Sequence, residues 1–287
     1  MNRYCGDYTD IKNYVIKCDQ RFYIDICDRG CGNGCVYCYV DSKNEKQELL
    51  KLSQIQKICE YIDVEYGNVP KIISLCPNTE PMKSPESIEL ILYIIRFFIP
   101  RNSYIQISTK ERIPKSFLNE INRFAEGRIF INTSLPYIIN ASAVEPRATP
   151  IEERLQNFLN IKEYPNLNAC LYIKPFSEDA YRNAQSFIDI IEKYGIDTVC
   201  VGVEFQKGTE VPCRSLYDKQ IAKVLFKEQA ERLNDFVRKL RQNTKAKVFG
   251  SSVCCIYHRF NKKCLLDIPQ YDNMLCKDCA CYASIVS

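Results

Sequence analysis

Runs of apolar and β-branched residues alternate along the chain with longer segments in which apolar positions recur at helical spacing. The apolar runs are nearly continuous, as is typical of strands buried on both faces of a parallel sheet. We predict strands at 21–27, 71–76, 104–109, 128–134, 167–175, 197–205 and 247–252. We predict helices over about 46–64, 85–98, 115–126, 150–161, 178–194 and 219–243. This order favours right-handed crossovers in an α/β fold, a partial (β/α)6 TIM-like barrel, with its chemistry at the carboxyl ends of the strands.

Two of the predicted helices begin at residues whose chemistry marks a helix start. Ser84 precedes Pro85, which fits a cap followed by proline at the first helical position. Thr149 is followed three residues later by Glu152, which is the spacing of a capping box. We therefore expect a helix to begin at each of these two positions.

The composition is that of a globular protein, with 287 residues, 46% apolar and 26% charged, and it includes 17 cysteines. No apolar stretch is long enough to cross a membrane, and the first ten residues, MNRYCGDYTD, lack the apolar core of a signal peptide. We expect a cytoplasmic protein, in which clustered cysteines are more often metal ligands or catalytic groups than disulfides. We divide the chain into an N-terminal segment (1–20), a barrel (21–245) and a cysteine-rich C-terminal extension (246–287).

The formal net charge of +4 does not by itself indicate a nucleic-acid-binding protein. The positive excess is local, because the segment 223–247 holds eight lysines and arginines against three acidic residues. Such a segment is either the solvated face of a helix or a contact for an anionic partner.

The stretch ICDRGCGNGCVYCYV (26–40) follows the first predicted strand and contains a C-x3-C-x2-C motif formed by Cys31, Cys35 and Cys38. Glycines interleave with these cysteines and allow the backbone to fold tightly around an inorganic centre. Structural zinc sites normally take four protein ligands, often from two separated pairs, whereas this loop supplies three. A [4Fe–4S] cluster usually takes four thiolates, so three would leave one iron open to another ligand. Cys27, at the strand end, is interpreted as a buried core thiol.

With Tyr37 between the second and third cysteines, the motif resembles that of the radical S-adenosylmethionine (SAM) superfamily. The resemblance implies that Cys31, Cys35 and Cys38 hold a [4Fe–4S] cluster whose open iron binds SAM. It also implies reductive cleavage of SAM to a 5′-deoxyadenosyl radical that abstracts hydrogen from a substrate. Tyr37 would border the adenine, and an electron donor such as flavodoxin or ferredoxin would be a partner.

The resemblance implies further SAM contacts at the ends of later strands. Glu80, in the Asn-Thr-Glu-Pro stretch after the second strand, would bind the SAM amino group, although the glycines usual there are missing. Lys110 would pair with the SAM carboxylate, and Ser134 or Thr133 would hydrogen-bond the ribose. Each of these hydroxyls could equally be an ordinary turn residue, and their joint position at strand ends favours the functional interpretation.

A narrower resemblance, over about 22–205, is to the spore photoproduct lyase and DNA-repair-photolyase-like branch. It rests on YIQISTK (104–110) and on an E-P element that contains Glu145, Pro146 and Arg147, followed by Arg154 in a helix. We expect Glu145 and Arg154 to form a salt bridge between the loop and the helix. The branch also implies that Cys76, at the end of the second strand, is a hydrogen-atom donor, and the alternative is a thiol that only packs in the core.

Six cysteines crowd the segment 249–282, and this departs from the lyases. Cys276 and Cys279 have the spacing of a chelating pair, which Cys264 and either Cys254 or Cys255 would complete. We predict that Cys255, Cys264, Cys276 and Cys279 hold a second [4Fe–4S] cluster or zinc, and unligated thiols are the alternative. The single histidine, His258, is either a ligand or base of this segment or a polar surface residue.

The sequence thus predicts a radical SAM enzyme whose reaction class, lyase, epimerase or another, stays open. The lyase-like core and the basic 223–247 segment favour a modified DNA base as substrate. The C-terminal cysteines favour a peptide or small molecule. The alternative from another class is a cysteine-rich zinc-binding scaffold protein without catalysis.

Overall fold

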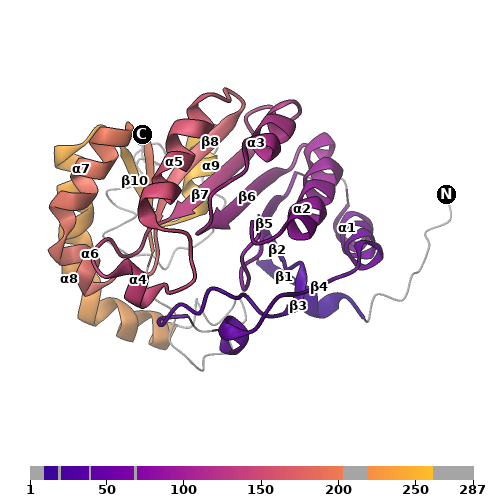
Figure 1. Cartoon of the computed structure of the whole chain (residues 1–287), viewed down its shortest axis with the longest axis horizontal. Helices are drawn as coiled ribbons and strands as arrows, with labels where there is room; N and C mark the ends of the chain where they lie inside the picture. Colours follow the sequence, from indigo (N-terminus) through magenta and orange to yellow (C-terminus); the bar gives the residue numbers. More distant parts are fainter. Residues whose placement is uncertain (1–9, 19–20, 39, 68–69, 203–218, 261–287) are drawn as a thin grey trace.

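The computed structural model of the chain describes residues 10–18, 21–38, 40–67, 70–202 and 219–260. Eight strands form one sheet in the order β1-β2-β5-β6-β7-β8-β9-β10, in which every neighbouring pair is parallel except β1 and β2. Figure 1 shows the sheet curving with helices along its outer side. The strands are β1 (Val15–Cys18), β2 (Arg21–Ile24), β5 (Ile72–Leu75), β6 (Tyr104–Thr109), β7 (Ile129–Ser134), β8 (Leu167–Ile173), β9 (Thr198–Val201) and β10 (Lys247–Phe249). The predicted α/β partial barrel is confirmed.

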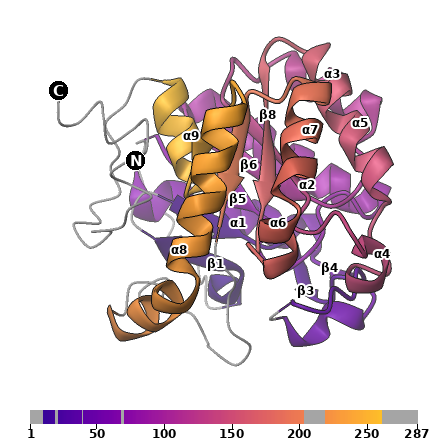
Figure 2. The ribbon, with the colours of Figure 1, turned by 90° about the vertical axis from the view of Figure 1, so that its left-hand side faces the viewer.

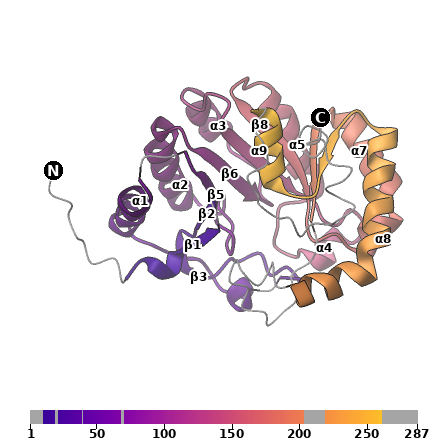
Figure 3. The same ribbon diagram turned by 180° about the vertical axis from the view of Figure 1, so that it is seen from behind.

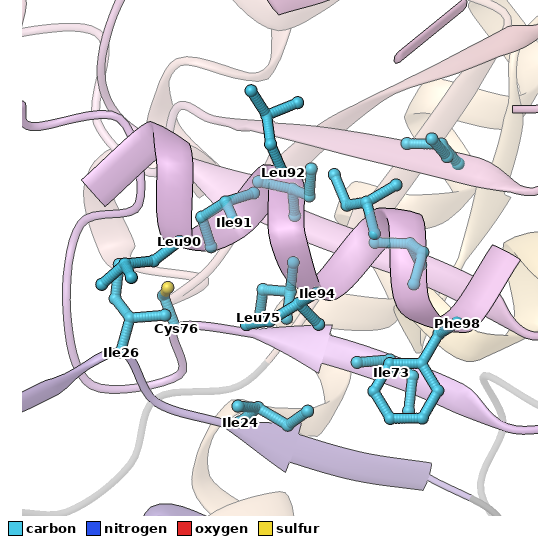
Figure 4. Close-up of a cluster of buried hydrophobic side chains, with 14 of the residues drawn as sticks. Ile24, Ile26, Ile73, Leu75, Cys76, Leu90, Ile91, Leu92, Ile94 and Phe98 are labelled. Carbon is cyan, nitrogen blue, oxygen red and sulfur yellow. The ribbon is translucent and has the colours of Figure 1, made fainter. Parts of the chain in front are cut away.

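Helices from the crossovers cover the convex face of the sheet. They are α1 (Leu52–Tyr66), α2 (Pro85–Phe98), α3 (Lys115–Asn122), α5 (Ile151–Lys162), α7 (Ala184–Tyr194) and α8 (Lys219–Asn243), with the short α4 (Ala141–Val144) and α6 (Glu178–Arg182). Figure 2 shows α7 and α8 side by side beyond the last strands. In the layer between the sheet and α2, Ile73 and Leu75 lie beneath Ile94 and Phe98 (Figure 4), all at most 3% exposed. Burial of this apolar layer drives the helices onto the sheet.

Three expectations about where helices begin or continue differ from the structure. The helix predicted from 46 begins at Leu52, because Glu48–Leu49 forms β4 and pairs with β3 (Cys27–Arg29). The helix predicted over 178–194 is interrupted at Asn183 between α6 and α7. The capping box at Thr149 is wrong, because α5 begins after Pro150 and the Thr149 hydroxyl donates to Glu111 instead.

The concave face of the sheet is covered by α9 (Ser252–Arg259), as Figure 3 shows from behind. Phe130, Cys170, Cys200 and Phe249 on the strands pack against the apolar face of α9. Because β10 pairs with β9 and α9 packs on the sheet, residues 247–259 are continuous with the barrel. Among the described residues, none of the helices has the length and apolarity that a membrane span requires.

Candidate functional site

The cysteine motif forms a tight loop at the carboxyl end of β2. Three glycines allow the backbone conformation of this loop. Gly30, Gly32 and Gly34 have φ angles of 84°, 81° and 64°, in the region that favours glycine. A Cβ on Gly30 would lie 2.1 Å from the Lys46 carbonyl oxygen, and one on Gly34 would lie 2.7 Å from Asn44 Oδ1. The loop is therefore folded closely against the segment that carries η2 (Asp41–Asn44).

The loop gathers the three thiols of the motif at the edge where the strands end. Cys35 is buried, Cys31 and Cys38 are half-buried, and the Cys38 amide donates to the Cys35 carbonyl at 3.1 Å. Burial and then the nearby Glu80 carboxylate raise the pKa of Cys31 to about 12, while the Lys110 ammonium acts in the opposite direction. A positive charge beside the cysteines favours their thiolate form, which is the form that binds a metal.

The donor set can be tested against the two kinds of metal site. Among the described residues, no three cysteine, histidine or carboxylate side chains converge closely enough to hold one metal ion. A mononuclear zinc site requires such convergence, whereas a [4Fe–4S] cluster binds each thiolate to a different iron. The loop supplies three thiols, which is the number that a [4Fe–4S] cluster with one iron open to another ligand would take.

Glu80 lies beside this loop, and only 3% of its surface is exposed. Its Oε1 accepts from the Thr109 hydroxyl and, at 3.2 Å, from the Met82 amide. Its Oε2 accepts from the Lys110 amide at 2.8 Å and, at 3.5 Å, from Asn33 Nδ2. Burial raises the pKa of this carboxyl group. Glu80 therefore connects the turn after β5 and the end of β6 to the cysteine loop.

Tyr37, Lys110 and Glu145 come together although they are far apart in sequence. The Tyr37 hydroxyl donates to Glu145 Oε1, and Lys110 Nζ lies 3.9 Å from the same oxygen. The Tyr37 ring stacks on Tyr137, with 5.4 Å between the centroids. Arg154 donates to Glu145 Oε2 at 2.7 Å, which confirms the expected salt bridge. Sequence reasoning missed the Tyr37–Glu145 contact, because no local pattern relates residues separated by 108 positions.

The two hydroxyls at the end of β7 differ in their surroundings. Ser134 is on the same strand face as Phe130, which lies on the concave side of the sheet, and its carbonyl accepts from Arg154 at 2.9 Å. Thr133 shares the opposite face with Ile131, and its buried hydroxyl has no hydrogen-bond partner among the described residues. Ser134 therefore faces the concave side of the sheet, whereas Thr133 faces the helix layer.

Cys76 follows β5 and is 4% exposed, with a φ of 57°. Its thiol packs with Ile26 and Leu90 in the apolar layer under α2 (Figure 4). Burial raises the pKa of this thiol well above its usual value. The structure thus shows that the thiol packs in the core, and the hydrogen-donor role stays a prediction.

Only one of the four predicted ligands of the C-terminal extension, Cys255, lies among the described residues. Cys255 lies on α9, 4% exposed, with its Sγ 4.0 Å from that of Cys170. Cys264, Cys276 and Cys279 lie outside the described residues, so the second metal centre stays a prediction. His258 Nε2 lies 2.7 Å from Lys247 Nζ.

The basic segment 223–247 largely coincides with α8. On the described part of this helix, Leu233 and Phe236 pack toward the barrel. Arg238 and Lys239 both pair with Asp235, at 2.6 and 2.8 Å. The contacts fit the solvated face of an amphipathic helix.

No protein-family model matches the sequence, and no curated protein matches it. Solved structures do match the fold, and the three that follow are radical SAM enzymes. A spore photoproduct lyase mutant with bound AdoMet and dinucleoside spore photoproduct gives a TM-score of 0.56 at 12% identity, over 80% of this chain and 76% of that chain. SuiB of Streptococcus suis, bound to the precursor peptide SuiA, gives a TM-score of 0.54 at 13% identity, over 88% of this chain and 54% of that chain. The protein anSMEcpe with bound AdoMet gives a TM-score of 0.53 at 13% identity, over 84% of this chain and 66% of that chain. The chain therefore has the fold of radical SAM enzymes.

Proposed function

We propose that this protein is a radical SAM enzyme whose [4Fe–4S] cluster is held by Cys31, Cys35 and Cys38. The observation that carries the proposal is the position of these thiols, in a glycine-rich loop at the carboxyl end of β2 with Lys110 nearby. In barrels of this kind, the chemistry lies at that end of the strands. When bound, the cluster would supply the electron that cleaves SAM to a 5′-deoxyadenosyl radical.

The side chains around the loop would bind and orient SAM. Lys110 supplies a positive charge for the SAM carboxylate, and the Tyr37 ring would border the adenine. Ser134 would contact the ribose at the end of β7. Glu80 would meet the SAM amino group, and its bonds to the Lys110 amide and Asn33 keep this carboxylate beside the cysteine loop. The protein thus contributes binding, orientation and electrostatics.

The substrate is proposed at the level of class. Among the solved structures that match the fold, a spore photoproduct lyase binds a dinucleoside spore photoproduct, and SuiB binds a precursor peptide. In the described part of α8, surface ion pairs engage Arg232, Arg238 and Lys239, which weakens the argument for DNA. We therefore favour a peptide or small molecule, with flavodoxin or ferredoxin as electron donor, and a second [4Fe–4S] cluster or zinc in the C-terminal extension.

The test is anaerobic reconstitution of the wild type and of the variant Cys31→Ala/Cys35→Ala/Cys38→Ala. We expect about four irons per cluster in the wild type and SAM cleavage that depends on a reductant. The triple variant should lose the cleavage, and any iron that it retains reports on the C-terminal cysteines. Cys59→Ala, which removes a buried thiol on α1, is the matched control and should keep both properties. A colourless zinc protein, or SAM cleavage by the triple variant, would contradict the proposal.

A further inference from the structure

Glu145 has a contact pattern that a simple salt bridge to Arg154 does not require. Its side chain is 0% exposed, and its carboxylate meets groups from three separate segments. These are the Tyr37 hydroxyl from the cysteine loop, the Lys110 ammonium from the end of β6, and the Arg154 guanidinium from α5. One buried carboxylate therefore joins three elements that the fold brings to the same edge of the sheet.

The charges around this carboxylate explain why it is stable in the interior. An unpaired carboxylate is costly to bury, whereas one with cations and hydrogen-bond donors on both oxygens is compensated. Arg154 donates to Oε2 at 2.7 Å, and Lys110 Nζ lies 3.9 Å from Oε1. The same guanidinium also donates to the Ser134 carbonyl at 2.9 Å. Glu145 is thus connected, directly or through Arg154, to each of Tyr37, Lys110 and Ser134.

The residues next to Glu145 hold the cysteine loop by its backbone as well. The Val36 amide donates to the Val144 carbonyl at 2.9 Å. Arg147 donates to the Asn44 carbonyl at 3.2 Å and to Asn44 Oδ1 at 2.6 Å, on the segment against which the loop is folded. Residues 144–147 therefore contact both the loop and its support, and Glu145 supplies the one buried charge of this segment.

We propose that Glu145 is a positioning residue of the SAM site, which orients Tyr37 and Lys110 relative to the three cysteines. The inference rests on the proposed function and adds to it a residue that touches neither the cluster nor SAM. Glu145 acts through the Tyr37 hydroxyl, which its Oε1 fixes, and through the ammonium group of Lys110. Loss of its charge leaves the cysteine ligands in place and misplaces the two groups that meet SAM.

The test compares Glu145→Gln with the wild type after anaerobic reconstitution. The amide keeps the shape of the side chain and removes its charge, so we expect unchanged iron per chain. The dissociation constant for SAM should rise by about 10- to 100-fold, the factor expected when a hydrogen bond to a charged group is lost. The change that SAM causes in the electron paramagnetic resonance spectrum of the reduced cluster should need correspondingly more SAM. The matched control is Asp63→Asn, which removes a carboxylate of α1 that pairs with Arg101. This variant should bind SAM like the wild type.

A second variant keeps the inference testable if Glu145→Gln does not fold. Tyr37→Phe retains the ring and removes the hydroxyl that donates to Glu145, so it should also weaken SAM binding. In the double variant Tyr37→Phe/Glu145→Gln, the dissociation constant for SAM should rise by less than the product of the two single-variant increases. This is because both substitutions break the same contact. SAM affinity within twofold of the wild type in both single variants would overturn the inference. A wild type that binds neither iron nor SAM would instead overturn the proposed function.

Discussion

The carboxyl group of Asp25 provides a quantitative test of the electrostatics at the carboxyl end of β2. Asp25 directly follows the strand and is half-buried. Its Oδ2 accepts from Asn78 Nδ2 at 2.6 Å, and its Oδ1 accepts from the Asn78 amide at 3.3 Å. Burial outweighs these two hydrogen bonds and raises the pKa of Asp25 from 3.8 to about 6. We therefore expect the charge on Asp25 to destabilise the folded protein at neutral pH.

The sign and size of this effect follow from proton linkage. Between about pH 4 and pH 6 the folded state binds more protons at Asp25 than the unfolded state does, so its contribution to stability falls as the pH rises through this window. The penalty is absent below the unfolded pKa and complete above the folded pKa. A difference of about two pKa units corresponds to at most about 3 kcal/mol, and solvent that reaches the half-buried group reduces this to about 1–2 kcal/mol.

Asp25→Asn removes the ionisation, and an amide flip of Asn78 can restore the side-chain hydrogen bond. The free energy of unfolding of the variant minus that of the wild type should increase by about 0.5–1 kcal/mol from pH 4.5 to pH 8, because part of the penalty is already present at pH 4.5. The assay is urea-induced unfolding of the protein without cluster across this range. Asp235→Asn is the control of opposite sign, because hydrogen bonds from Lys239 and Arg238 lower the pKa of Asp235 to about 2. A difference between Asp25→Asn and the wild type that does not change with pH would refute the reasoning.

Two further substitutions test the packing that supports the site. Arg154→Met leaves Glu145 buried without its closest cation and should lower the unfolding free energy by about 3–5 kcal/mol, and adding Glu145→Gln should recover part of this loss. Phe98→Ala, at a side chain of α2 that is 0% exposed, should lower the free energy of unfolding by about 3–5 kcal/mol in the same urea assay. Phe97→Ala should lower it less, because Phe97 is only half-buried. Equal costs at the two phenylalanines would contradict the packing argument.

The sequence predicted most of the barrel because its parallel strands are locally encoded. Each is a short apolar run between helical patterns, and α2 has the predicted bounds because Ser84 caps it ahead of Pro85. The antiparallel strand β1 (Val15–Cys18) was not predicted, since a short edge strand with exposed positions has no continuous apolar signal. The helix cap predicted at Thr149 is wrong because a hydroxyl can bond to any nearby acceptor, and the fold places the Glu111 carboxylate next to Thr149.

By itself, the sequence determined the features that depend on neighbouring residues. The spacing of Cys31, Cys35 and Cys38 and the glycines among them specify the loop, because backbone freedom and chelate geometry are local properties. Only the tertiary structure decided which distant groups meet that loop. The contact between Tyr37 and Glu145 depends on how the loop packs against α4 and α5, and the core position of Cys76 depends on which face of the sheet its thiol takes. The chemistry at the strand ends is therefore encoded locally, whereas its orientation is a product of packing across the whole barrel.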